Sequence, residues 1–152
     1  MSETTIQTGI QTAIRAMSEF DNADVVINDW SILDQSSSAA PYVIIENADE
    51  FTSKQDTVTP DNTWQIQVTL IERFDNWKSS LDNLRTRRQA IIDKINTDTI
   101  RSAGGLANVT IDEVRAGGPI GYIYNRYLTD EQMAEALPAF LSQLIILSAE
   151  EF

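Results

Sequence analysis

The sequence has no cysteine and no histidine among its 152 residues. Without thiolates and imidazoles it can form neither a disulfide framework nor a zinc finger. It also cannot supply a Cys-His pair or a Ser-His-Asp triad for nucleophilic catalysis. We therefore expect a protein that is not an enzyme and needs no cofactor.

Basic residues are scarce as well. The chain has 11 Lys and Arg against 23 Asp and Glu, which gives a formal net charge of −12 and a pI near 4.2. Tight binding to duplex DNA is driven by Lys and Arg that replace counterions, so this composition argues against DNA as a tightly held ligand.

Long hydrophobic runs are missing too. No segment approaches the ~18 apolar residues that a membrane-spanning helix needs, so no membrane partner is expected. Residues 1–5 are polar and acidic, which is unlike a secretory signal and predicts a protein that stays in the cytoplasm after synthesis. A hydrophobic content of 42% with 22% charged residues is typical of a chain that folds around a core. At this length we expect one domain spanning residues 1–152.

The apolar residues present change their spacing along the chain. Helical spacing predicts an amphipathic helix over residues 6–17, and a short strand is expected over 25–30. A β-branched strand over 42–45 lacks alternation, which predicts burial on both faces. Residues 47–63 are mostly polar and predict a projecting loop or hairpin, and strict alternation over 64–70 predicts a strand with one wet face.

The second half repeats these signals. A helix is expected over 79–96, with Ser79 as its N-cap. A strand is expected over 108–115, with Val109 and Ile111 on one face and Thr110, Asp112 and Val114 on the other. It is followed by a turn at 117–119, a short helix over 130–137 and a strand over 140–147.

This order predicts an α+β fold. We expect a mostly antiparallel sheet with two main helices on one face and an extra short helix before the last strand. The Gln/Thr side of the strand at 64–70 predicts a sheet that is covered on one side only.

Acidic and glycine-rich segments are the candidates for a metal site or a phosphate-binding loop. A magnesium-dependent hydrolase would draw its ligands from Glu46, Asp49, Glu50, Asp56, Asp61, Asp112 and Glu113. Most of these residues lie in one polar segment, where solvation is the simpler interpretation, so no metal site and no catalytic residue are predicted. The glycine pairs at 104–105 and 117–118 lack the Lys-Ser/Thr of a nucleotide-binding loop and are read as turns.

The basic residues are concentrated in one segment. Seven of the eleven lie between residues 73 and 101, which carries +3 while the remainder carries −15. One interpretation is a solvated helix with local pairs such as Asp82 with Arg85, each contributing about 0.2–0.5 kcal/mol. The other is a basic flank, centred on Arg85, Arg87 and Arg88, that meets an acidic flank of a neighbouring copy. The sequence leaves both open.

The aromatic residues divide between core and surface. Trp64 is expected in the core, and Trp30 and Trp77 are expected to seal core edges. Tyr122 and Tyr124 lie in a segment bounded by glycines and are candidate interface anchors.

The order of these segments resembles a known family. Five segments carry the resemblance: the amphipathic helix over 6–17, the Pro-Tyr-Val-Ile-Ile segment at 41–45, the strand led by Trp64, the Arg-rich helix over 81–95 and the closing strand. Together they resemble the tail-terminator, or tail-completion, proteins of long-tailed bacteriophages. The resemblance lies in the chain length, the order of the expected elements and the kinds of residue in them, and it spans nearly the whole chain. The segment 122–137 departs from the family's pattern.

The resemblance implies a structural virion protein at the head–tail junction, present in the host cytoplasm during assembly. Such proteins form a hexameric ring that caps the tail tube, ends its polymerisation and docks to the head connector, and DNA passes through the channel without specific binding. In this setting Arg85, Arg87, Arg88, Tyr122 and Tyr124 are candidates for the subunit interface. Candidates for contact with the tube or connector are Phe51, Lys54 and Asp56.

Three alternatives stay open. A head-completion or stopper protein on the connector side belongs to the same assembly. A small acidic inhibitor that mimics DNA would need carboxylates spaced like phosphates along one face. A metal-dependent hydrolase would need Asp112 for magnesium-dependent turnover.

Overall fold

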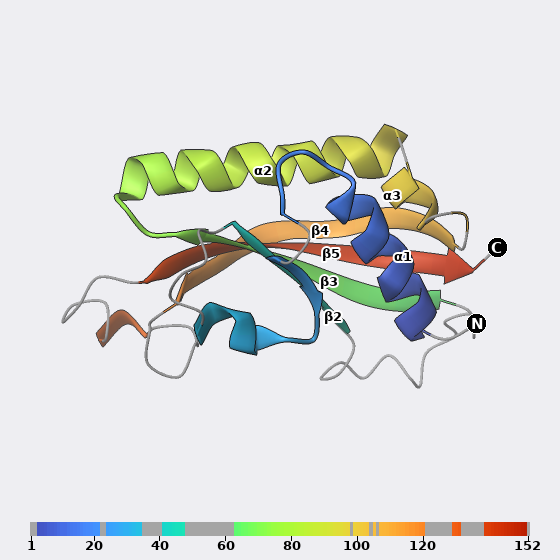
Figure 1. Ribbon diagram of the computed structural model, residues 1–152, viewed down its shortest axis with the longest axis horizontal. Coiled ribbons are helices and arrows are strands. Elements are labelled where there is room, and N and C mark those ends of the chain that lie inside the picture. The colour runs from blue at the N-terminus through green and yellow to red at the C-terminus, as the bar shows by residue number, and fades with distance from the viewer. Residues whose placement is uncertain are drawn as a thin grey trace.

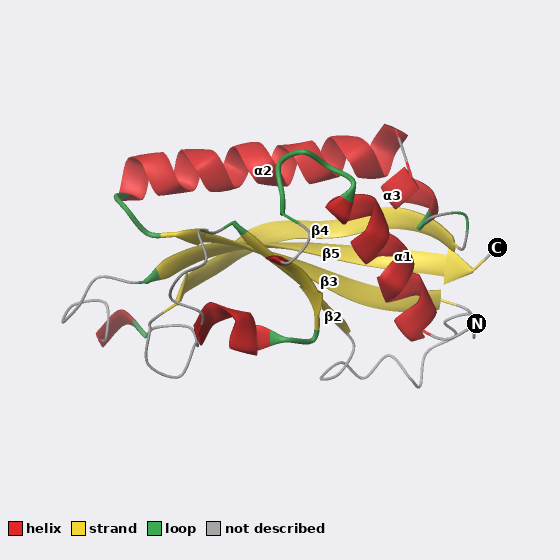
Figure 2. Ribbon diagram, viewed as in Figure 1, coloured by secondary structure: helices red, strands yellow, loops and turns green. Residues whose placement is uncertain are grey.

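The computed structural model of the protein describes residues 3–21, 24–34, 41–47, 63–97, 99–103, 105, 107–120, 129–131 and 139–151. Its elements are, in chain order, α1 (Glu3–Arg15), β1 (Val25–Ile27), the 3₁₀ helix η2 (Trp30–Asp34), β2 (Tyr42–Asn47), β3 (Thr63–Arg73), α2 (Trp77–Thr97), α3 (Thr99–Ser102), β4 (Ala107–Ile120) and β5 (Phe140–Glu151). Figure 1 labels the three α-helices and the strands β2 to β5, and Figure 2 distinguishes helices from strands.

The strands form one five-stranded sheet in the order β1-β2-β3-β5-β4. Only β1 and β2 run parallel, and the three other pairs are antiparallel. The last strand of the chain, β5, therefore lies inside the sheet between β3 and β4. The predicted α+β fold with a mostly antiparallel sheet is confirmed.

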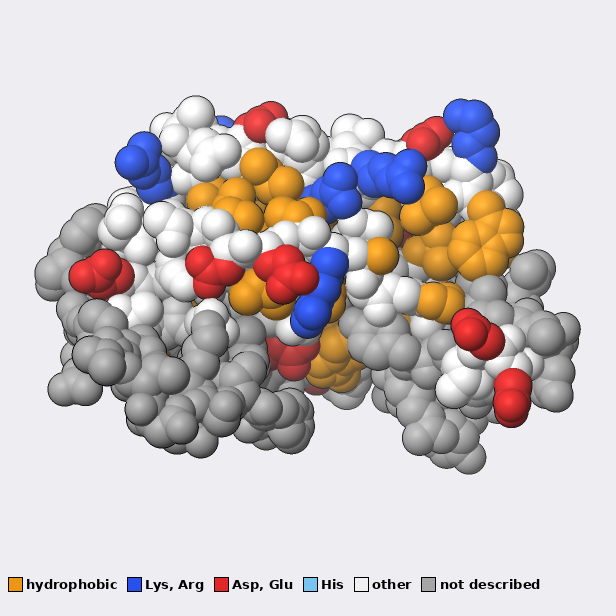
Figure 3. Space-filling model, turned by 180° about the vertical axis from the view of Figure 1, so that it is seen from behind, with side chains coloured by type: hydrophobic (Ala, Val, Ile, Leu, Met, Phe, Trp, Pro, Cys, Tyr) orange, Lys and Arg blue, Asp and Glu red, His pale blue; other side chains and the backbone are white. Residues whose placement is uncertain are grey.

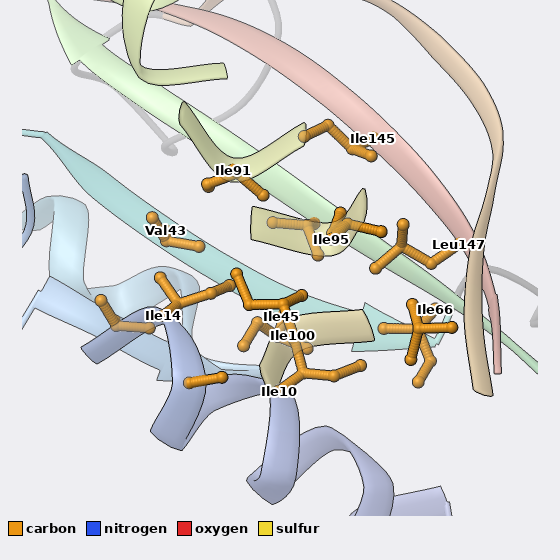
Figure 4. Packing of buried hydrophobic residues seen from close by; sticks show 14 of the residues in the cluster. Ile10, Ile14, Val43, Ile45, Ile66, Ile91, Ile95, Ile100, Ile145 and Leu147 are labelled. Atoms are coloured by element: carbon orange, nitrogen blue, oxygen red, sulfur yellow. The ribbon is translucent and has the colours of Figure 1, made fainter. Parts of the chain in front are cut away.

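The two main helices share one face of the sheet. Ile10 and Ile14 of α1 and Ile91 and Ile95 of α2 belong to one buried cluster. The sheet residues facing them include Val43, Ile45, Ile66, Ile145 and Leu147 (Figure 4). Each fully buried Ile or Leu stabilises the fold by about 1.5–3 kcal/mol, so this layer supplies most of the driving force that holds the helices on the sheet.

The opposite face of the sheet is not uniformly exposed to solvent. A second hydrophobic cluster lies there, where η2 packs on strand ends. It consists of Ile32, Leu33, Tyr42, Ile44, Ile71, Ile120, Ala139 and Phe140. The expectation of a sheet covered on one side only is therefore wrong. On β3, Thr69 is fully buried and Gln67 is half-buried, so the predicted wet face of this strand is also wrong in part.

Strand β2 follows its prediction. Residues 42–45 are all buried, with Val43 and Ile45 in the helix-side cluster and Tyr42 and Ile44 in the other. The missing alternation is explained because each face of β2 meets a hydrophobic layer.

The strand predicted over 25–30 ends early, at Ile27. The next residue, Asn28, has a φ of 55°, a left-handed conformation that interrupts an extended chain and that Asn tolerates better than most residues. The chain then turns into η2, which places Trp30 against the second cluster.

Strand β4 is longer than predicted, because the segment 117–119 continues the strand instead of turning. Two β-bulges, between Ile111 and Glu113 and between Ala116 and Gly118, absorb extra residues. A Cβ on Gly117 would lie 2.2 Å from Ser142 Oγ, and Gly118 has a φ of 104°. The glycines are therefore required by the second bulge.

The first bulge also changes which side chains share a face. Val114 was predicted on the face of Thr110, but its partner on β5 is Ile145, which belongs to the helix-side cluster. Cross-strand partners point to the same face, so Val114 lies on the helix side.

Some predicted elements lie outside the described residues. The projecting loop expected at 47–63 is described only at its ends, and the short helix expected over 130–137 only at its first two residues. Among the helices of the described residues, none has the length and hydrophobicity to cross a membrane.

Candidate functional site

The charged surface of α2 is the first candidate. α2 begins at Trp77 because Asn76 caps it, with its Oδ1 accepting a hydrogen bond from the Ser79 N–H at 2.9 Å. The predicted cap at Ser79 is therefore wrong by one turn, since Ser79 supplies the donor. The basic residues of α2 lie in different environments, some exposed to solvent and others between the helix and the sheet.

Arg85 lies on the outer, exposed side of α2. Lys78, Lys94 and Arg101 are exposed as well, and they extend the basic surface along α2 and α3. The predicted local pair of Asp82 with Arg85 is replaced by Lys78 with Asp82, at 3.0 Å. At 89% and 55% exposure of these two side chains, that pair is a surface contact of small energy.

Arg87 and Arg88 point the other way. Arg87 Nη1 donates to the carboxylate of Glu72 on β3, and Arg88 Nη1 donates to Gln143 Oε1 on β5. Both guanidinium groups are half-buried between helix and sheet, and Arg88 Nε has no hydrogen-bond partner among the described residues. The three arginines predicted to act together are therefore separated, with Arg85 outside and the other two inside the subunit.

Glu72 is the acidic member of these polar contacts between α2 and the sheet. Burial raises the pKa of its carboxyl above the usual 4.5, while the adjacent positive charge and hydrogen bond of Arg87 act in the opposite direction. Glu72 is not among the candidate residues predicted from the sequence. The alternation Ile66, Val68, Leu70 continues to Glu72 and places it on the helix side, so the signal was present in the strand pattern.

The acidic surface of β4 is the second candidate. Asp112 Oδ2 accepts hydrogen bonds from Gln65 Nε2 at 3.2 Å and from the Ser148 hydroxyl. Glu113 lies 3.8 Å from Arg115, measured between Oε1 and Nη1, and both side chains are more than half exposed. Within the described part of the chain, no three His, Cys, Asp or Glu residues group closely enough to hold a metal ion.

Glu46, another acidic candidate, is engaged on the far side of the sheet. It accepts hydrogen bonds from Trp30 Nε1 at 3.2 Å and from Gln67 Nε2 at 3.3 Å. Its oxygens thus join η2 to the sheet, which is a structural role.

The aromatic candidates fall into different environments. Trp64 packs against the helix-side core, as predicted. Trp77 is 45% exposed and contacts Phe74 edge-on, with ring centroids 5.0 Å apart. Tyr122 and Tyr124 lie outside the described residues.

The candidate contact residues Phe51, Lys54 and Asp56 also lie outside the described residues. The view from behind in Figure 3 shows basic side chains along the upper edge of the molecule with acidic ones among them, and hydrophobic, acidic and basic side chains below. Basic and acidic side chains are therefore interspersed on this face of the described surface.

No protein-family model matches this sequence, and no curated protein matches it.

Proposed function

We propose that this protein is a structural virion protein of a long-tailed bacteriophage. It forms a ring, expected to be a hexamer, at the head–tail junction, where it caps the tail tube, ends tube polymerisation and docks to the head connector. It acts without catalysis, and DNA passes through the ring without specific binding.

The observation that carries the proposal is the order of the segments that resemble tail terminators. The amphipathic helix, the β-branched strand, the Trp-led strand, the Arg-rich helix and the closing strand correspond to α1, β2, β3, α2 and β5. All five belong to one sheet and its helix layer, which supports the proposal because a ring subunit must be a folded unit.

The distribution of charge supports self-assembly. A ring is built from heterologous contacts, in which two different surfaces of each subunit meet. The segment from 73 to 101 carries +3 and the remainder carries −15. Arg87 and Arg88 of this segment lie inside the subunit, so its exposed basic residues are Lys78, Arg85, Lys94 and Arg101. Opposite charges orient such contacts, so a basic α2 surface is suited to meet an acidic surface of the next subunit.

The same charge supports a channel that does not retain DNA. A net charge of −12 on every subunit repels phosphates. DNA can therefore move past such a ring without being held.

The test combines purified protein with tail tubes of the same phage. Electron microscopy is expected to show a ring on one end of each tube, with tube growth stopped. Native mass spectrometry of the protein released from capped tubes is expected to detect a hexamer. A protein that neither assembles nor binds tubes would refute the proposal. Binding to filled heads that lack tails, with no binding to tubes, would instead assign it to the stopper position.

Arg85 allows a sharper version of this test. Arg85→Glu is expected to shift the ring toward smaller species because it reverses an exposed charge on the contact surface. Arg85→Lys keeps the charge and is the matched control. Arg87 and Arg88 are unsuitable for this purpose, since their reversal would place like charge or an unpaired group inside the subunit.

A further inference from the structure

The two edges of the sheet differ in how they are protected. At one edge, β1 is only three residues long, and its Val25 carbonyl oxygen accepts hydrogen bonds from Gln11 and Arg15 of α1, at 2.9 Å from Gln11 Nε2 and 3.0 Å from Arg15 Nη2. At the other edge, β4 is 14 residues long. No strand of the described residues pairs with the outer side of β4, and such an edge presents backbone N–H and C=O groups to which another strand can pair.

The middle of β4 is the most accessible part of this edge. Residues 112–116 are all exposed, and Val114, at 36% exposure, is one of the two exposed large hydrophobic residues among those described. The two bulges lie on either side of residues 113–116, and bulges bend a strand and interrupt pairing. Any added strand is therefore confined to this short stretch.

The side chains of this stretch alternate. Glu113 and Arg115 pair with Ile146 and Leu144 of β5 and point away from the helices, whereas Val114 points to the helix side. Figure 3, the view from behind Figure 1, shows acidic, basic and hydrophobic side chains close together near the middle of that face.

Two copies of this edge can pair antiparallel about a two-fold axis perpendicular to the sheet. Such an axis keeps the helices of both copies on the same side of the combined sheet. It lies between the two strands, so in each register one residue lies opposite its own copy. An axis at Glu113 or Arg115 places like charges opposite each other, which is destabilising. An axis at Val114 places Glu113 opposite Arg115 of the second copy, twice, and brings the two Val114 side chains together.

We infer that the free protein dimerises by pairing its β4 edges antiparallel, with Val114 on the two-fold axis. The charge pattern of residues 113–115 is complementary to itself in this register and in neither neighbouring one. The contact is short, so the dimer is expected to dissociate readily. A two-fold contact closes on itself and cannot propagate a six-fold ring, so this inference is independent of the proposed function.

Sedimentation velocity on the purified protein tests the inference. The measurement is made at about 0.15 M salt, where the Debye length of ~8 Å screens the long-range repulsion between the two acidic copies. The unsubstituted protein is expected to show a monomer–dimer equilibrium. Glu113→Arg and Arg115→Glu are each expected to weaken dimerisation by about tenfold or more, because both cross-strand pairs become like-charged.

The decisive samples are the mixture and the double variant. Mixing E113R with R115E is expected to restore a dimer, since each Arg of one variant then faces a Glu of the other. The double variant E113R/R115E is expected to dimerise like the original protein, because the pairs are only exchanged. Far-UV circular dichroism checks that each variant is folded, which is expected for substitutions at exposed positions.

A second readout uses the unsubstituted protein. Amide hydrogen exchange within residues 112–116 is expected to slow as the concentration rises, while exchange in β1 stays constant. A monomer at all concentrations, a dimer insensitive to both single substitutions, or a mixture of variants that stays monomeric would each overturn the inference. Tube capping is measured separately, so loss of the dimer with capping retained leaves the proposed function intact.

Discussion

The carboxylate of Glu72 on β3 accepts a hydrogen bond from Nη1 of Arg87 on α2. The two side chains are 11% and 26% exposed and link the helix to the sheet inside the hydrophobic layer. Removing one member of such a pair leaves the other buried without its partner, which costs more than the pair itself contributes.

Arg87→Met is therefore expected to lower the free energy of unfolding by about 1–3 kcal/mol, because it leaves the Glu72 carboxylate without its donor. Urea denaturation followed by circular dichroism measures the change. Arg85→Met is the matched control, since Arg85 is exposed on the same helix, and its effect is expected to stay within about 0.5 kcal/mol. Equal effects of the two substitutions would contradict the internal role of Arg87.

The stability should also depend on pH through Glu72. Burial raises the pKa of this carboxyl in the folded protein, so the folded state holds the proton more tightly than the unfolded chain does. The contribution of Glu72 to the free energy of unfolding is therefore fully present below the unfolded value near 4.5 and is lost as pH rises through the raised folded pKa.

Glu72→Gln isolates this contribution because it removes the titrating group and keeps an acceptor for Arg87. The free energy of unfolding of the original protein minus that of E72Q is expected to fall as the pH rises from about 4.5, with the other carboxyls cancelling in the difference. Urea denaturation at a series of pH values measures it. A difference that grows with pH would mean that Arg87 outweighs burial.

Much of the fold could be predicted from the sequence because hydrophobic periodicity reports which face of an element is buried. The helical spacing in α1 and α2 and the alternation in β3 correspond to elements of the sheet and its helix layer. Periodicity does not report local backbone conformation. The positive φ at Asn28 and the bulges of β4 depend on neighbours in space, so the ends and faces of those strands were predicted wrongly.

The candidate site was predictable only in part for a similar reason. The sequence indicates that basic residues are concentrated on one helix, but not which of them face inward. Arg88 occupies a position in the apolar stripe of α2, which is a sign that it points to the sheet. Its acceptor, Gln143, lies 55 residues further along the chain, and a contact at that separation cannot be derived from spacing.

The start of α2 offers a direct test of the cap. Asn76→Ala is expected to lower the free energy of unfolding by about 1 kcal/mol, because the Ser79 N–H at the helix start loses its acceptor. Ser79→Ala is expected to change it by less than about 0.5 kcal/mol, since the backbone N–H remains. Denaturant midpoints of the two variants, with Asn76→Asp as a control that retains an acceptor, measure the difference. A larger effect at Ser79 would restore the cap predicted from the sequence.

The second bulge of β4 can be tested by filling the space at Gly117. A Cβ at this position would lie 2.2 Å from Ser142 Oγ and 3.1 Å from Ser142 Cβ, so Gly117→Ala is expected to lower the free energy of unfolding by about 1–3 kcal/mol. Ser142→Ala removes the nearest atom, although it also loses the hydrogen bond that the hydroxyl donates to the Gly118 carbonyl at 2.8 Å.

A double-mutant cycle separates these two effects. Gly117→Ala is expected to cost less in the Ser142→Ala background than in the original protein, because the closest contact is then absent. Urea denaturation of the four proteins gives the coupling free energy. If Gly117→Ala costs the same in both backgrounds, the glycine is required by the backbone conformation of the bulge and not by its close approach to β5.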